Sequence, residues 1–79
     1  MGLVVYTRDG CKESAVMREY LQSRGLAHRI RRVDGDVGAR REWEDLDGQV
    51  TPLVVIDQRQ IVRGLDRARL DQLTGWIGC

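Results

Sequence analysis

Residues 3–14 read LVVYTRDGCKES, and this stretch decides the fold. Its first five residues are mostly apolar and β-branched, which predicts a buried strand. Cys11 then stands where a helix is expected to begin, and the helix should continue to Arg24 before Gly25 stops it. The apolar residues of this segment fall on one helical stripe, formed by Val16, Met17, Tyr20 and Leu21. The first unit of the chain is therefore a strand, a turn and a helix, with a cysteine at the junction.

Downstream of this unit, the chain predicts three further strands. Residues 27–33 include several arginines and predict an edge strand, because charged side chains protect an exposed sheet edge. Residues 53–57, LVVID, predict a second buried strand, and residues 60–63 predict a fourth strand. Only Gln58-Arg59 separates the last two strands, so we expect them to form a hairpin.

Two further helices are each preceded by an aspartate that can act as an N-cap. Asp36 can cap a helix that continues to about Asp47 and ends at Gly48, and Asp66 can cap the last helix. Both segments place apolar residues at helical spacing. The inward face of the first consists of Ala39, Trp43 and Leu46, and that of the second of Leu70, Leu73 and Ile77, with Trp76 beside it.

The expected order of elements is β-α-β-α-β-β-α, which defines an α/β fold. We expect the first two strands to form a parallel, right-handed crossover unit and the last two to be antiparallel. Helices would then cover both faces of a four-stranded mixed sheet. We expect residues 1–79 to form a single domain, since no linker, repeat or low-complexity segment interrupts them.

The composition limits the possible functions. Lys and Arg total 13 and Asp and Glu total 12, so a net charge of +1 gives nucleic acid or a lipid surface little to bind. The longest apolar runs have four residues, whereas a membrane span needs about 20. No cleavable signal is evident, and two cysteines do not form the dense pattern of small secreted domains. We therefore expect a cytoplasmic monomer that binds neither membrane nor nucleic acid.

Cys11 is the candidate for chemistry. Unpaired N–H groups at a helix start present positive potential, which stabilises a thiolate and lowers the thiol pKa. Arg8 and Lys12 favour the thiolate, while two neighbouring acidic residues oppose it. Ser14 lies at i+3, where its hydroxyl can reach back to the sulfur but cannot form a disulfide. A small buried hydrophobic cysteine is the alternative, and the placement at a helix start favours function.

The other notable positions have simpler interpretations. Pro52 is the only proline and marks the entry to a buried strand, with its peptide bond cis or trans. Cys79 ends a helix that should run about 18 Å away from the site, so it should not bridge to Cys11 within one molecule. It is a terminal thiol without a role or forms an intermolecular bridge. Scattered cysteines and one histidine do not supply a zinc site, so no metal is expected.

Three arginines gather in the expected edge strand. They are Arg29, Arg31 and Arg32. The simple interpretation is a solvated edge, and contact with an acidic partner is the alternative.

Three segments together resemble the glutaredoxins, small members of the thioredoxin-fold superfamily. They are VVYTRDGCKES at 4–14, VTPLVVID at 50–57 and RGLD at 63–66. Their order and spacing match over essentially the whole chain, and Cys-x-x-Ser resembles the monothiol kind. The resemblance implies the thioredoxin-like fold and a thiol–disulfide oxidoreductase with glutathione as co-substrate. Its other partners would be glutathionylated or disulfide-bonded proteins.

The resemblance also implies roles for residues around the first helix. Cys11 would be the nucleophile, and Ser14 would stand where dithiol members have a resolving cysteine. Arg8 occupies a place where the family often has lysine and would pair with a glutathione carboxylate. Lys12 would add positive charge to the same binding site.

A second group of implied roles lies near the strand ends. Thr51 and Pro52 match the end of the family's Thr-Val-Pro, and the Thr51 backbone would bind the cysteinyl part of glutathione like an added strand. Leu65 and Asp66 match the segment whose amides hold the γ-glutamyl carboxylate at a helix start. Gln49 is a candidate for the glycyl end.

The active motif here is Cys-Lys-Glu-Ser, without the proline and aromatic residue usual in the family, and Val50 replaces the family's threonine. Iron–sulfur scaffold members have Cys-Gly-Phe-Ser instead. Alternative functions are a non-catalytic module of the same fold that binds glutathione, an iron–sulfur cluster or a protein, and an arsenate-reductase or Spx-like protein. Arsenate-reductase and Spx-like proteins have an arginine after the serine, where this chain has Ala15. A partner of thioredoxin reductase would normally have Cys-x-x-Cys.

Overall fold

The computed structural model describes residues 2–75 and confirms the expected order of elements. Strand β1 and helix α1 come first, and the remaining elements follow in the order β2, α2, β3, β4 and α3. Their bounds are Leu3–Thr7 for β1, Lys12–Ser23 for α1, Arg29–Arg32 for β2, Val37–Asp45 for α2, Leu53–Ile56 for β3, Gln60–Arg63 for β4 and Arg67–Thr74 for α3. Within residues 2–75, none of the helices has the length and apolar character to cross a bilayer.

The sheet has the strand order β2-β1-β3-β4, so β2 is an edge strand as expected. β1 pairs in parallel with β2 and antiparallel with β3, and β3 pairs antiparallel with β4. Tyr6, near the end of β1, lies opposite Leu53 at the start of β3, which in turn lies opposite Arg63 at the end of β4. The segment after β1, the segment before β3 and the segment after β4 therefore meet at one end of the sheet.

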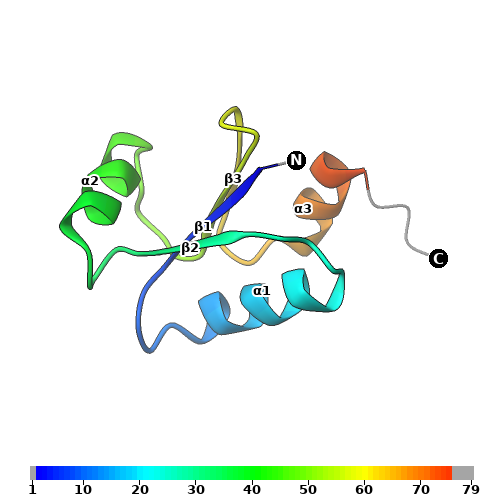
Figure 1. The fold of residues 1–79 in the computed structure, drawn as a ribbon, viewed down its shortest axis with the longest axis horizontal. Helices are drawn as coiled ribbons and strands as arrows, with labels where there is room; N and C mark the ends of the chain where they lie inside the picture. The colour runs from blue at the N-terminus through cyan, green and yellow to red at the C-terminus, as the bar shows by residue number, and fades with distance from the viewer. Residues whose placement is uncertain (1, 76–79) are drawn as a thin grey trace.

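Side chains alternate along each strand, so the apolar strands present buried side chains on both faces of the sheet, and helices cover both faces. On one face, Leu3 and Val5 pack with residues of α1 and α3, such as Met17 and Leu70. On the other face, Tyr6 and Leu53 pack with Trp43 of α2 and with Val33. Figure 1 shows α2 on one side of the strands and α1 with α3 on the other.

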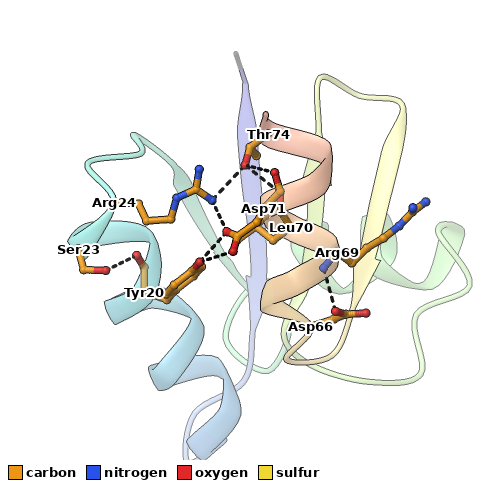
Figure 2. Close-up of polar contacts among 8 residues, drawn as sticks. All are labelled: Tyr20, Ser23, Arg24, Asp66, Arg69, Leu70, Asp71 and Thr74. Atoms are coloured by element: carbon orange, nitrogen blue, oxygen red, sulfur yellow. Dashed lines mark hydrogen bonds and ion pairs between the residues drawn. The ribbon is translucent and has the colours of Figure 1, made fainter. Parts of the chain in front are cut away.

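Helices α1 and α3 are joined by a polar cluster that fixes their relative position. The Arg24 guanidinium lies 2.6 Å from Asp71 Oδ1 and donates to Thr74 Oγ1 at 3.0 Å, and its side chain is only 7% exposed. The Tyr20 hydroxyl donates to both carboxylate oxygens of Asp71, at 2.5 and 2.7 Å. Figure 2 shows Tyr20 of α1 and Arg24, the residue that follows α1, directed at α3. The Asp66 carboxylate accepts from the Arg69 N–H at 3.0 Å, which confirms the expected cap of α3.

The structure corrects several details of the sequence interpretation. Val16 is 38% exposed, so it lies at the margin of the stripe whose buried members include Met17 and Leu21. The β3–β4 turn begins at Asp57, which takes a positive φ of 53°, so the reversal starts one residue earlier than expected. Helix α2 ends at Asp45, and Asp47 adopts a φ of 58°. The predictions for Trp76, Ile77 and Cys79 lie outside the described residues.

Of the three arginines of β2, Arg29 is exposed as expected, whereas Arg31 and Arg32 have partners within the protein. Arg31 makes two hydrogen bonds to Glu42 of α2, at 3.1 and 2.8 Å, and Arg32 forms an ion pair with Asp9. The two side chains have different partners because successive residues of a strand point to opposite faces of the sheet, so that Arg31 faces α2 and Arg32 faces the other side. The pair with Asp9 ties the loop before α1 to the edge strand.

Candidate active site

Cys11 is the N-cap residue of α1, as the sequence predicts. Its backbone is extended, with φ −82° and ψ 109°, and its carbonyl accepts the first helical hydrogen bond from the Ala15 N–H at 3.2 Å. The Cys11 N–H donates to the Arg8 carbonyl at 3.2 Å, which closes the turn that follows β1. Gly10 makes this turn possible because its φ is 77°, a value that side-chain-bearing residues rarely adopt. Cys11 therefore lies at the end of α1 whose first N–H groups have no partner within the helix.

Thr51 contacts the sulfur from the segment that precedes β3. The Thr51 hydroxyl donates to Cys11 Sγ at 3.3 Å, and the Cys11 thiol donates to the Thr51 carbonyl at 3.5 Å. The Thr51-Pro52 peptide bond is cis, which the sequence left open, and Pro52 is buried. The two residues meet across 40 positions of sequence because β1 ends beside the start of β3.

The segment around Thr51 is held on both sides. The Trp43 indole N–H donates to the Val50 carbonyl at 3.0 Å, and the Gly64 N–H donates to the Pro52 carbonyl at 2.8 Å. Gly48 packs so closely on Trp43 that an added Cβ would lie 2.5 Å from its ring and its carbonyl oxygen. Helix α2 and the end of β4 therefore both position the threonine against the sulfur.

The pKa of the Cys11 thiol lies below its ordinary value. Partial burial raises this pKa, because it penalises the charged thiolate. The hydroxyls of Ser14 and Thr51 and the backbone N–H groups of Ser14 and Glu13 favour the thiolate and together outweigh burial. With the sulfur as a thiol, the Ser14 hydroxyl is buried and completes no hydrogen bond with another described residue. It is thus available to the thiolate, as the i+3 spacing predicted.

A cleft of about 300 Å³ opens on the β2 side of the sulfur. Cys11, Ser14 and Arg18 line it from α1, and Ile30 and Arg32 line it from β2. Arg8 also borders it, from the turn after β1. The spacing of seven residues from Cys11 to Arg18 is two helical turns, which puts both residues on one face of α1.

The structure distributes the other predicted residues over the same end of the sheet. Arg8 is exposed, and its guanidinium lies 5.8 Å from the centroid of the Trp43 ring. Lys12 and Gln49 are exposed. Leu65, which comes directly before Asp66, is half-buried.

Asp66 has internal partners for both its side chain and its backbone. Its carboxylate caps α3, and its N–H donates to the Gly64 carbonyl at 3.1 Å. One of the two amides expected to receive a glutathione carboxylate is therefore already engaged within the chain.

Sequence reasoning missed three contributions to this site. The Thr51 hydroxyl was not foreseen as a donor to the sulfur, because that contact depends on strand register. Arg18 could have been found from its i+7 spacing to Cys11, whereas Arg32 was identified only as part of the edge-strand cluster, and nothing in the sequence placed it beside the cleft. Among residues 2–75, no group of three or more His, Cys, Asp or Glu side chains is placed to hold a metal ion.

This arrangement of a helix-start cysteine beside a proline loop agrees with the family comparison. The family model described as Glutaredoxin matches residues 3–61, and the chain belongs to the glutaredoxin family. Its fold and family are those of thiol–disulfide redox proteins. A comparison with curated proteins gave no match.

Three solved structures show how far the likeness extends. The crystal structure of the thioredoxin-like protein BC3987 is 35% identical, with a TM-score of 0.82, and the match covers 90% of this chain and 97% of that one. The glutaredoxin-like protein NrdH-redoxin from Escherichia coli is 19% identical, with a TM-score of 0.83 and coverage of 92% and 95%. Buckwheat glutaredoxin, in a complex with glutathione, is 15% identical, with a TM-score of 0.71 and coverage of 94% and 70%. The matches to NrdH-redoxin and to buckwheat glutaredoxin, at 19% and 15% identity, show the shared fold alone.

Proposed function

We propose that this protein is a glutathione-dependent thiol–disulfide oxidoreductase of the monothiol kind, in which Cys11 supplies the protein's attacking sulfur. The observation that carries the proposal is the environment of that sulfur. Cys11 lies at a helix start with a lowered pKa, and Thr51 of the cis-proline segment donates a hydrogen bond to it. A thiolate is the nucleophile in disulfide exchange, so this environment prepares the group that the reaction needs.

The reaction consists of two exchanges. In the first, the Cys11 thiolate attacks the glutathione sulfur of a protein–glutathione mixed disulfide. A new disulfide forms between Cys11 and glutathione, the old disulfide breaks, and the target protein leaves as a thiolate that takes up a proton. In the second, a glutathione thiolate attacks the glutathione sulfur on Cys11, which releases glutathione disulfide and restores the Cys11 thiolate.

Ser14 determines that the second exchange needs an external thiol. A hydroxyl at this position cannot form a disulfide with Cys11, so glutathione resolves the intermediate. The buried hydroxyl instead stabilises the departing Cys11 thiolate, in agreement with its effect on the pKa. We assign Ser14 to the catalytic site on this ground.

The bound glutathione is assigned to the segments that meet beside the sulfur. The Thr51 backbone, which precedes cis-Pro52, would pair with its cysteinyl part, as a strand added to the sheet end. Leu65 and Asp66, before α3, would receive one carboxylate, for which the Asp66 N–H would exchange its Gly64 acceptor for the ligand. The other would meet exposed cationic or polar side chains, for which Arg8, Lys12 and Gln49 are available. The glutathione complex of a protein with the same fold supports this choice of co-substrate.

The test is the addition of glutathione disulfide to the purified protein, followed by mass spectrometry. We expect one glutathione adduct on Cys11, its loss in Cys11→Ser, and its retention in Cys79→Ser. A coupled assay should then show turnover of a glutathionylated protein with reduced glutathione. Turnover by thioredoxin reductase without any glutathione adduct would contradict the proposal and favour a thioredoxin-type electron supply.

A further inference from the structure

The cleft on the β2 side of Cys11 has a cationic lining that the proposed reaction leaves unused. Arg18 and Arg32 line it from α1 and β2, and we call it the arginine cleft. Arg18 is exposed and has no hydrogen-bond or ion-pair partner within residues 2–75. Arg32 pairs with Asp9, yet its side chain remains 53% exposed, so it can still meet a second anion. The cleft thus presents more positive than negative charge beside the reactive sulfur.

The floor of the arginine cleft contains an unsatisfied donor. Ser14 lines the cleft and is 2% exposed, and its hydroxyl has no partner among the described residues. A buried hydroxyl without a partner is uncommon in a native structure, and a functional role is one explanation for it. While Cys11 is still a thiol, before the exchange, this hydroxyl can donate to a polar group of the segment that occupies the cleft.

The length of the cleft favours a peptide over a small anion. Cys11 and Arg18 are seven residues apart on one helix, which corresponds to about 10 Å at 1.5 Å per residue. A single small anion cannot bridge that span, whereas an extended peptide covers it in about three residues at 3.3 Å each. Ile30 on the opposite wall offers an apolar surface to the aliphatic part of such side chains.

We propose that the arginine cleft binds an acidic segment of the protein substrate, so that Cys11 prefers target cysteines with aspartate or glutamate within about three residues. The inference rests on the proposed function, because it names the substrate class of the same sulfur. Arg18 is the specificity-determining residue, since its guanidinium has no internal counter-ion to displace. Arg32 supports it from the edge strand.

The test compares two short glutathionylated cysteine peptides that differ only in glutamate or glutamine at the three positions on either side of the cysteine. We expect kcat/KM to be about two- to fivefold higher for the glutamate peptide, the range of one solvent-accessible charge pair. This preference should decline as salt is added. Arg18→Gln should bring the ratio close to one, and Arg18→Glu should reverse it.

Arg59→Gln is the matched control, because Arg59 is exposed in the β3–β4 turn, at the other end of the hairpin from Pro52. This variant should keep the ratio of the wild type. Equal rates for the two peptides in the wild type, or a ratio that Arg18→Gln leaves unchanged, would overturn the acidic-substrate inference and leave the proposed function intact. If neither peptide transfers glutathione to Cys11, the proposed function itself fails, and the inference fails with it.

Discussion

Thr51→Val removes one hydrogen bond to the reactive sulfur and little else. Valine keeps the β-branched shape of threonine but lacks the hydroxyl that donates to Cys11 Sγ at 3.3 Å. The Thr51 carbonyl, which accepts from the thiol at 3.5 Å, remains in place. The Ser14 hydroxyl and the backbone N–H groups of Ser14 and Glu13 also continue to favour the thiolate. We therefore expect the pKa of Cys11 to rise while the site keeps its form.

The expected size of the change follows from the strength of a hydrogen bond to a charged group. Such a bond contributes about 1.5–3 kcal/mol, and one pKa unit corresponds to about 1.4 kcal/mol. Because Cys11 is only partly buried and water can replace the lost donor, we take the lower end, a rise of about one unit. The thiolate fraction below both pKa values then falls about tenfold, but each remaining thiolate is about threefold more nucleophilic, since the Brønsted coefficient is about 0.4–0.5.

These two effects give opposite results at low and high pH. At a pH below both pKa values the variant should react with a small disulfide about three- to fourfold more slowly, and at a pH above both it should react about threefold faster. The assay is the rate of exchange against pH, in a Cys79→Ser background so that only Cys11 titrates. Thr51→Ser keeps a hydroxyl and should stay close to the parent. A loss of rate that is equal at every pH would refute the assigned hydrogen bond, because it would indicate a displaced cysteine.

Three further predictions concern ionisation and packing. The alkylation rate of Cys11 should rise with pH through a pKa below that of free cysteine, about 8.5. The thiolate should also stabilise the fold at pH values above the pKa of the unfolded chain, and this stabilisation should be lost as the pH falls through the pKa of the folded protein. Denaturation of the wild type and of Cys11→Ser at several pH values measures it. Gly48→Ala should destabilise the fold by about 1–3 kcal/mol in urea, because its Cβ would meet the Trp43 carbonyl, which cannot turn away; Gly2→Ala, with open space around it, should be neutral. Asp71→Asn should lower the free energy of unfolding by about 1–3 kcal/mol, because it removes the carboxylate opposite the shielded Arg24 guanidinium. A urea midpoint equal to that of the wild type would contradict the stabilising role of the polar cluster between α1 and α3.

Much of the fold could be predicted because its signals are local. The apolar strand before Cys11 and the capping residue Asp66 are visible in a few neighbouring residues, and the structure places each where expected. Errors arose where a local signal was weak. The β3–β4 turn lacks glycine, so nothing in the sequence indicated that Asp57 and Gln58 would both take positive φ.

Only the part of the site that lies within one helix or one sequence motif could be predicted. Cys11 and Ser14 share a helical turn, so their relation follows from spacing. The contact of Cys11 with the Thr51 hydroxyl joins residues 40 positions apart, and it depends on the antiparallel register of β1 with β3. The arginine cleft likewise needs the parallel pairing that carries Arg32 to the start of α1. Local patterns contain no information about such contacts.

The two sides of the sulfur have separable tasks. Thr51 contacts Cys11 from the side of the proline segment and acts on its ionisation, which every substrate experiences equally. Arg18 stands two turns along α1 from the sulfur and acts only on the charge of the group that lies in the cleft. Because Ser14 within the motif and Thr51 outside it both favour the thiolate, a Cys-Lys-Glu-Ser motif without the usual proline and aromatic residue is compatible with the proposed exchange. The proposed selectivity comes from outside the motif, from Arg18 farther along α1.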